Sequence, residues 1–424
     1  MFKIIKKKGP LQPIRYGPYI GLCAFCCLFM IFGVVMSSSP ATLLKGVCAI
    51  IQDPDYLISD YIGIGGIGAA FFNSGLLTFL MTALLFFFKI NITGISISSL
   101  LTVSGFALFG KNILNVWPIV LGVYFYSLYQ KEHFSRYIYI ALFGTALAPL
   151  VSHLLFSSLL PLLLRPLASF ILGISVGMML PPLVSAFLRF HQGYNLYNVG
   201  FVTGVLGTVY VSILRSYGLL VETRMIWTTG NNKLLGIFFI AIFIIMICTA
   251  FTLDRWSKIK WVMAYSGRAV SDFVILEGWG ATLMNMGTMG LLATFYILVI
   301  GGDLNGPTIG GILTVVGFSA FGKHPRNTIP IILGIALGAI TKKWSLAAPP
   351  IQLAALFGTT LAPITGEFGW KYGVLAGFIH SSVVLNVGML HAGFNLYNNG
   401  FSGGLVAAVL LPLIEAFAGG DKRS

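Results

Sequence analysis

Charged residues are scarce in this 424-residue chain: Asp, Glu, Lys and Arg together make up only 9%, whereas 57% of the residues are apolar. A soluble protein carries about 25% charged residues, so this composition excludes a soluble enzyme and a disordered chain. Several apolar runs contain no charge, and the clearest extends from Leu234 to Leu253. A run of about 20 residues crosses a hydrocarbon core of about 30 Å as a helix. The sequence therefore predicts an all-α polytopic membrane protein.

Cysteines and the usual catalytic motifs are also few or missing. The five cysteines lie mostly inside apolar runs, where a thiol behaves as a small buried hydrophobe, so no disulfide framework and no metal or redox site is predicted. The sequence has no Walker loop, H-E-x-x-H or G-x-S-x-G motif, and no soluble domain that could hydrolyse ATP. A pump and most kinds of enzyme are therefore not expected, and no cofactor is predicted.

Acidic residues are fewer than basic ones, 12 against 26, which gives a net charge of +14. In so apolar a chain this excess indicates membrane topology and not a nucleic-acid partner, since no basic soluble domain is present. Basic residues precede the first apolar run, 17–36, and by the positive-inside rule they place the N-terminus in the cytoplasm of a plasma membrane. These residues are Lys3, Lys6, Lys7, Lys8 and Arg15.

The chain repeats itself. A shift of 212 residues carries Ser59 and Asp60 onto Ser271 and Asp272, and it also superposes longer motifs further along. After a loop of different length the shift becomes 200, and the segment 191–201 meets 391–401, both reading His-x-Gly-[Tyr/Phe]-Asn-Leu-Tyr-Asn-x-Gly-Phe. We interpret the chain as a tandem duplication with halves 1–222 and 223–424.

Each half is predicted to contain about five membrane spans, which in the first half are 17–36, 61–88, 114–130, 137–157 and 166–189. The segment 95–110 would be only about 24 Å long as a helix, too short to cross comfortably, so we expect it to be re-entrant. Non-helical backbone at membrane depth is tolerated where protein or a water-filled cavity satisfies it. A re-entrant segment therefore implies a cavity or pore.

Five crossings per half would place the second half upside down relative to the first, as an inverted-topology repeat. The charges after the first span support this, because they are mostly acidic in one copy and basic in the other: Asp53, Asp55 and Asp60 against Arg255, Lys258, Lys260 and Arg268. Two observations oppose it. The loops that contain Lys131 and Lys343 are basic in both copies, and the segments after His191 and His391 would make six crossings, and parallel repeats, if they crossed.

Polar residues that recur in both copies are the candidates for a substrate pathway, since inverted repeats place their substrate site near the midplane at the repeat interface. The two His-x-Gly segments supply uncharged donors and acceptors, together with aromatic walls, which suits a small polar solute. Their candidate residues are Tyr194, Asn195, Asn198, Phe394, Asn395 and Asn398. The alternative is that these Asn side chains cap the following helices and that the glycines only allow packing.

Two further pairs are expected to assist the pathway. Asn73 and Asn285 lie near the middle of apolar spans, so each must bond to another helix or to a solute. Thr102 and Thr314 lie in the predicted re-entrant segments.

Six ionisable residues are candidates for gating or coupling. Carboxylates at span boundaries can cap helices, attract solute or relay protons. Lysines after the re-entrant segments can stabilise a helix C-terminus, whereas lysines that face the pore would favour an anion. Histidines can gate or shuttle protons, or only end helices. The residues are Asp60, Asp272, Lys111, Lys323, His191 and His391.

Two segments resemble signatures of the urea transporter family. Asn305-Gly306-Pro307 followed by Gly310 is similar to its Asn-Pro-x-x-Gly motif, and Gly393-Phe394-Asn395 to its Gly-[Tyr/Phe]-Asn motif. The whole chain is more closely similar to an uncharacterised bacterial integral-membrane family known only as a domain of unknown function. The urea transporter resemblance implies two inverted halves, each of five spans plus a re-entrant helix, with a central slot and a trimeric assembly. The sequence departs from that family in its Asn-Leu-Tyr-Asn segments and its Lys111/Lys323 pair, which leaves the identity of the solute open.

We therefore expect a channel or facilitator for a small polar solute such as a urea-like amide, with the lipid bilayer and further copies of the chain as its partners. One alternative is a proton- or sodium-coupled secondary transporter of a small solute or anion. A third reading, an intramembrane enzyme that acts on a lipid, would use the same His and Asp residues.

Overall fold

The computed structural model describes residues 14–55, 58–156, 160–218, 224–253 and 259–418. In these ranges the regular structure is helical apart from two isolated β-bridges, Ser59 with Ile226 and Asp272 with Phe321. Nine of the helices described are long and apolar enough to cross a membrane, and the protein is an integral membrane protein. The basic residues Lys3, Lys6, Lys7, Lys8, Arg255 and Lys258, used above for topology, lie outside the described residues.

The described residues of the first half form nine α-helices. They are α1 (Tyr16–Val35), α2 (Pro40–Gln52), α3 (Tyr61–Phe87), α4 (Gly94–Phe106), α5 (Trp117–Tyr129), α6 (Ile138–Gly144), α7 (Ala148–Phe156), α8 (Arg165–His191) and α9 (Asn198–Ser216).

The second half contains ten α-helices in the residues described. They are α10 (Asn232–Leu253), α11 (Ile259–Val262), α12 (Phe273–Leu276), α13 (Gly278–Val299), α14 (Gly306–Phe318), α15 (Pro325–Thr341), α16 (Pro349–Phe357), α17 (Ala362–Phe368), α18 (Trp370–Val387) and α19 (Asn398–Ala418). Short 3-10 helices occur at Phe134–Arg136, Thr145–Leu147, Gly358–Leu361 and Gly388–His391.

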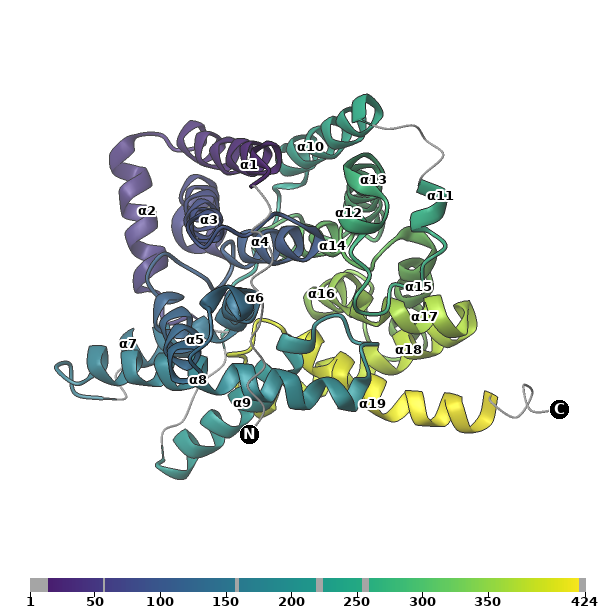
Figure 1. The fold of residues 1–424 in the computed structure, drawn as a ribbon. Helices are drawn as coiled ribbons and strands as arrows, with labels where there is room; N and C mark the ends of the chain where they lie inside the picture. The colour runs from purple at the N-terminus through teal and green to yellow at the C-terminus, as the bar shows by residue number, and fades with distance from the viewer. Residues whose placement is uncertain (1–13, 56–57, 157–159, 219–223, 254–258, 419–424) are drawn as a thin grey trace.

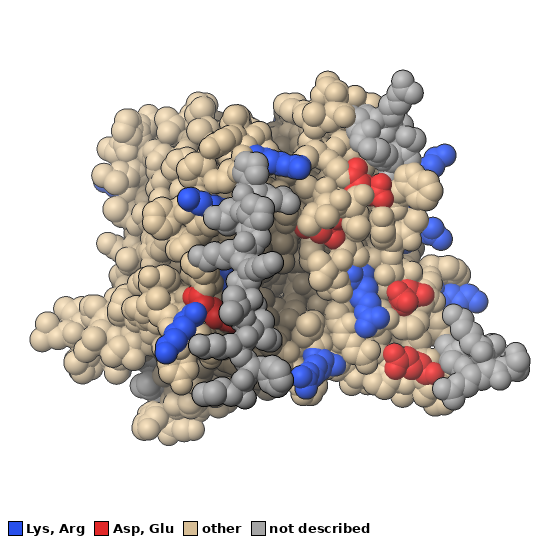
Figure 2. All heavy atoms as spheres, viewed as in Figure 1, with Lys and Arg blue, Asp and Glu red and all other residues tan. Residues whose placement is uncertain are grey.

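The two halves lie side by side, with repeat mates at matching places (Figure 1). α1 lies against α10 at one edge of the molecule, where the rings of Phe32 and Phe238 stack with centroids 4.0 Å apart. α9 and α19 lie together at the opposite edge. Figure 2 shows charged side chains scattered over an otherwise uncharged surface, as the composition requires.

The second long helix of each repeat is broken at an equivalent glycine. Gly66 interrupts α3 with a φ of +83°, and its mate Gly278, with a φ of +84°, separates α12 from α13. Glycine adopts this left-handed region without a steric penalty, and other residues rarely do. The expected continuous span 61–88 is therefore a short helix followed by a long one.

The predicted re-entrant segments form α4 and α14, two helices of 13 residues each. At about 20 Å they are too short to span a membrane. They cross at small residues: Gly105 packs against Gly310, and Gly317 packs against Ser98. The contact nearer the start of α4, at Ser98, meets the end of α14, and the contact near the end of α4, at Gly105, meets the first half of α14. The two helices therefore run antiparallel.

Some spans differ from the expected boundaries. The expected span 114–130 is represented by α5, only 13 residues long, and 137–157 is divided into α6 and α7 by the 3-10 turn Thr145–Leu147. A helix that sequence analysis missed, α2, starts at Pro40 after Ser39, whose hydroxyl accepts a hydrogen bond from the Thr42 backbone N–H. α9 and α19, which follow the His-x-Gly segments, are both among the helices long enough to cross.

Candidate functional site

Four pairs of aromatic residues form one buried cluster at the meeting point of the repeats. The Tyr197 and Tyr397 ring centroids lie 4.9 Å apart, and each ring contacts a phenylalanine of the opposite repeat, Phe318 and Phe106, at 4.7 Å. The C-terminal ends of α4 and α14 and the starts of α9 and α19 therefore converge here. We call this the central aromatic cluster; its members are Phe106, Phe109, Phe143, Tyr197, Phe318, Phe321, Phe357 and Tyr397.

Two fully buried lysines adjoin this cluster, one from each repeat. Lys323 Nζ donates hydrogen bonds to the hydroxyls of Tyr197 at 2.5 Å and Thr359 at 2.7 Å, and it lies 5.3 Å from the Phe318 ring centroid. Lys111 Nζ lies 5.0 Å from the Phe106 ring centroid and forms no hydrogen bond within the described part of the chain. The two ion pairs found among the described residues, Arg136–Glu132 and Arg224–Asp53, involve neither lysine.

The asparagines Asn73 and Asn285 hold the segments that follow α4 and α14. The Asn73 amide donates to the backbone carbonyls of Ala107 at 2.7 Å and Lys111 at 2.9 Å. Asn285 makes the equivalent bonds to Ser319 and Lys323, both at 2.7 Å. The carbonyls at a helix C-terminus need such donors, so these amides fix the position of the two lysines.

The carboxylates Asp60 and Asp272 hold the opposite ends of the same two helices. Asp60 Oδ1 accepts the Gly306 N–H at the start of α14, at 3.1 Å, and Asp272 Oδ1 accepts the Gly94 N–H at the start of α4, at 2.9 Å. Each carboxylate therefore caps the half-helix of the other repeat. A negative charge at a helix N-terminus is favourable because of the unpaired N–H groups and the helix dipole.

The histidines of the two His-x-Gly segments pair with asparagines seven positions further along the chain. Asn198 Oδ1 lies 2.9 Å from His191 Nε2, and Asn398 Oδ1 lies 3.0 Å from His391 Nε2. The two Asn amides also donate across to α8 and α18, to the carbonyls of Val184 and Val384. These four side chains fasten the starts of α9 and α19, outside the central aromatic cluster.

Asn195 and Asn395 bond across the repeat interface. The Asn195 amide donates to the Gly400 carbonyl at 2.9 Å, and the Asn395 amide donates to the Gly200 carbonyl at 3.2 Å. Their carbonyl oxygens accept from threonine hydroxyls, Thr360 at 2.5 Å and Thr203 at 2.9 Å. The two amides therefore join α9 to α19.

Four predicted residues remain, the aromatic residues Tyr194 and Phe394 and the threonines Thr102 and Thr314. Tyr194 stacks on Phe368 and lies under the Arg268 guanidinium, and Phe394 packs against His153, so neither belongs to the central aromatic cluster. Thr314 bonds to the Gly310 carbonyl of its own helix at 2.8 Å. Thr102 is buried on α4 and its hydroxyl has no hydrogen-bond partner within the described residues.

Sequence reasoning did not select several members of the cluster. Tyr197 and Tyr397 lie inside the repeated Asn-Leu-Tyr-Asn segments, and Phe106 and Phe318 recur under the shift of 212. Recurrence was thus the signal that could have found them. The aromatic walls of the pathway were instead assigned to Tyr194 and Phe394, which precede the Asn-Leu-Tyr-Asn segments.

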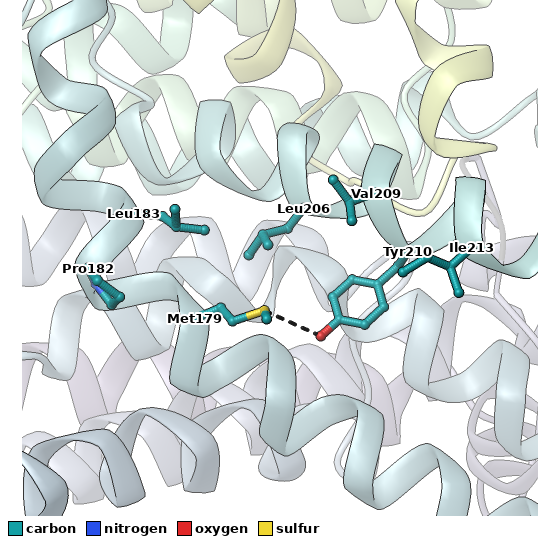
Figure 3. Close-up of a pocket in the computed structure, with 7 residues that line it drawn as sticks. All are labelled: Met179, Pro182, Leu183, Leu206, Val209, Tyr210 and Ile213. Carbon is teal, nitrogen blue, oxygen red and sulfur yellow. Dashed lines mark hydrogen bonds between the residues drawn. The ribbon is translucent and has the colours of Figure 1, made fainter.

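The grooves found on the outer surface do not contain the predicted residues. One groove of about 340 Å³ lies between α8 and α9, and Figure 3 shows Tyr210 donating a hydrogen bond to the Met179 sulfur at 3.7 Å across it. Its other lining residues are apolar: Pro182, Leu183, Leu206, Val209 and Ile213. A lipid-facing groove of this kind is distinct from a pathway at the repeat interface.

Comparison with known families gives one family, which matches the chain in two regions. A family model described as "Protein of unknown function (DUF1576)" matches the chain twice, over residues 39–216 and 252–416. The two matched regions fall in the two halves and together span most of the chain. No curated protein and no solved structure matches it.

Proposed function

The chain belongs to the DUF1576 family, and we propose that it is a membrane channel or facilitator. In this proposal a small polar solute, such as a urea-like amide, crosses at the interface of two inverted repeats. The pathway follows the central aromatic cluster between the ends of α4 and α14, and the Asn, Thr and Lys residues of both copies adjoin it.

The observation that carries this proposal is the pair of half-helices. All 13 residues of α14 are buried, and so are all those of α4 except Ile95. Both helices end in non-helical backbone beside buried lysines, hydroxyls and aromatic rings. Broken helices inside a membrane protein are tolerated where they line a cavity or substrate site, and in inverted repeats they typically point their ends at the solute.

Inversion of the repeats is part of the proposal. α4 runs antiparallel to its mate α14. α9 also runs antiparallel to α19, because Gly204 contacts Phe401 and Gly404 contacts Phe201. A two-fold axis that relates antiparallel mates is perpendicular to them. If α9 and α19 cross the bilayer, this axis lies in the membrane plane, which is the arrangement of inverted-topology transporters.

Three expectations from the sequence belong to this proposal. Similarity to an uncharacterised bacterial membrane family suggests a bacterial plasma membrane, the positive-inside rule places the N-terminus in the cytoplasm, and the resemblance to urea transporters implies a homotrimer. In such an assembly each subunit would contain its own pathway.

A coupled secondary transporter is the second candidate, and one asymmetry favours it. Lys323 is hydrogen-bonded to Tyr197 and Thr359, whereas its mate Lys111 has no hydrogen bond within the described residues. Alternating access in an inverted repeat needs equivalent elements in two different conformations, and these lysines provide such a pair.

Solute flux in proteoliposomes tests the proposal. A facilitator should pass solute down its gradient at a rate that imposed pH and sodium gradients do not change. Flux driven uphill by either gradient would favour the coupled transporter. Chemical turnover of a lipid or solute in detergent, without a vesicle, would contradict both transport functions and favour the enzyme.

A further inference from the structure

The Lys111 ammonium is the most unusual buried group in the protein. Its side chain is completely buried, and Nζ has no hydrogen-bond partner among the described residues. A buried ammonium is strongly unfavourable unless it is paired with a charge or with hydrogen-bond acceptors. Within the described ranges, Nζ lies over the face of the Phe106 ring, 5.0 Å from its centroid.

The carboxylates buried elsewhere are occupied by other groups. Asp55 accepts from the Tyr61 hydroxyl at 2.8 Å and the Asn115 amide at 3.1 Å. Asp60 and Asp272 accept from the half-helix N-termini described above. Neither buried lysine forms an ion pair with a carboxylate of the described residues.

Two more buried polar groups near Phe106 lack hydrogen-bond partners among the described residues. Tyr397 contacts Phe106 edge-to-face, with ring centroids 4.7 Å apart, and its hydroxyl is unpaired. Thr102 lies one turn before Phe106 on α4, and its hydroxyl is unpaired as well. In the described part of the chain, an ammonium and two hydroxyls near one phenylalanine are therefore free to donate hydrogen bonds to a ligand.

The second repeat shows how such donors are used when they meet. Lys323, Tyr197 and Thr359 there form a closed set, in which the ammonium donates to both hydroxyls. The equivalent residues around Lys111 are Tyr397 and Thr145. Thr145 donates to the Leu142 carbonyl at 2.6 Å, as Thr359 does to the Leu356 carbonyl, but Lys111 donates to neither hydroxyl within the described residues. Lys323 and Tyr197 are thus hydrogen-bonded to each other, whereas their repeat mates Lys111 and Tyr397 have no hydrogen-bond partner among the described residues.

We propose that Lys111, Tyr397 and Thr102 bind a small monovalent anion, which makes small anions the substrate class of this protein. This inference rests on the proposed function, because it assigns the solute to the same pathway. One negative charge balances one ammonium, and each hydroxyl donates one hydrogen bond to it. One ammonium does not balance a multivalent anion, and complete burial of Lys111 and Thr102 argues against a bulky one.

The first experiment measures anion flux into proteoliposomes under an imposed electrical potential. The probes are chloride, nitrate and formate, with gluconate as the bulky anion and urea as the neutral solute. The wild type should carry small anions and exclude gluconate. Lys111→Met should reduce anion flux about 10-fold or more, as expected when a charged hydrogen-bonding partner is lost. Lys233→Met removes the same charge at an exposed position of α10 and should leave flux unchanged.

The second experiment measures binding without transport. At constant ionic strength, replacing gluconate by chloride, nitrate or formate should raise the melting temperature of the wild type, since a ligand that binds only the folded state stabilises it. Tyr397→Phe keeps the ring packing and removes one donor, so it should weaken this effect several-fold. This variant also serves if Lys111→Met does not fold.

The outcomes separate this inference from the proposed function. If the wild type passes urea but no anion, and small anions do not raise its melting temperature, the anion inference fails and the proposed facilitator function stands. Anion flux and stabilisation that persist unchanged in Lys111→Met or Tyr397→Phe also overturn it. If no solute crosses the membrane, the proposed function fails. The anion site is then supported if small anions raise the melting temperature and the variants weaken this rise. It is overturned if small anions do not raise the melting temperature.

Discussion

The carboxylate of Asp60 accepts a hydrogen bond from the backbone N–H of Gly306, 246 positions further along the chain, at 3.1 Å. Its repeat mate Asp272 accepts the equivalent hydrogen bond from the Gly94 N–H at 2.9 Å. Each repeat thus supplies the cap for the half-helix of the other. A repeat expressed alone would leave the first turn of its own half-helix without this acceptor, so we expect the two halves to fold as one unit.

Asp60→Ala should loosen a helix of the opposite repeat. Losing an N-cap acceptor costs about 0.5–2 kcal/mol, and the Gly306 N–H at the start of α14 loses its partner. Hydrogen exchange measured by mass spectrometry should therefore accelerate in residues 306–309. Asp272→Ala should have the matching effect on residues 94–97.

Glu132→Ala is the control for these two variants, because Glu132 pairs with Arg136 at the surface and caps neither half-helix. An increase in exchange confined to the mutated repeat would contradict the crossed capping.

Gly105→Ala should destabilise the crossing of α4 and α14. A Cβ atom at Gly105 would lie 2.6 Å from the Gly310 carbonyl oxygen, which belongs to backbone and cannot rotate away. Overpacking of this kind costs about 1–3 kcal/mol, and thermal unfolding in detergent would measure it. Gly21→Ala on α1 is the matched control, since nothing lies within 4 Å of its Cβ position. Equal stability of the two variants would argue against a close crossing.

Single cysteines at Lys131 and Lys343 should react from opposite sides of the membrane. These lysines are repeat mates, both are exposed, and both loops are basic, so charge alone does not assign their sides. In a variant without the five native cysteines, a membrane-impermeant thiol reagent should label one position from outside and the other only after permeabilisation. Labelling of both from the same side would exclude the inverted arrangement.

Asn195→Leu and Asn395→Leu should each reduce solute flux per folded molecule. Each change removes the hydrogen bonds that an Asn side chain makes to a glycine carbonyl and a threonine hydroxyl at the crossing of α9 and α19, at a cost of about 1–3 kcal/mol. We expect folding to survive this loss, which size-exclusion chromatography would verify. The exposed Asn386→Leu variant is the control. Unchanged flux in the double variant would remove both residues from the pathway.

Recurrence along the chain identified the important positions, but it did not assign them partners. The Asn73 amide had to bond to another helix or a solute, because an apolar span offers it no other acceptor; the structure gives it the carbonyls of Ala107 and Lys111. Asp60 was a candidate cap, coupling group or solute attractor, and its place at α14 of the other repeat was not predictable. The pairing depends on how two helices pack that are far apart in sequence.

The sequence by itself determined that this is a helical membrane protein, because composition and run length decide whether a helix is more stable in lipid than in water. It also indicated the duplication and the two short segments, since both are properties of order along the chain. Only the tertiary structure decided that Tyr197 and Tyr397 meet at the centre, whereas Tyr194 and Phe394 lie outside it. That choice depends on close packing, because three positions along the non-helical segment between α8 and α9 separate a side chain at the interface from one packed elsewhere.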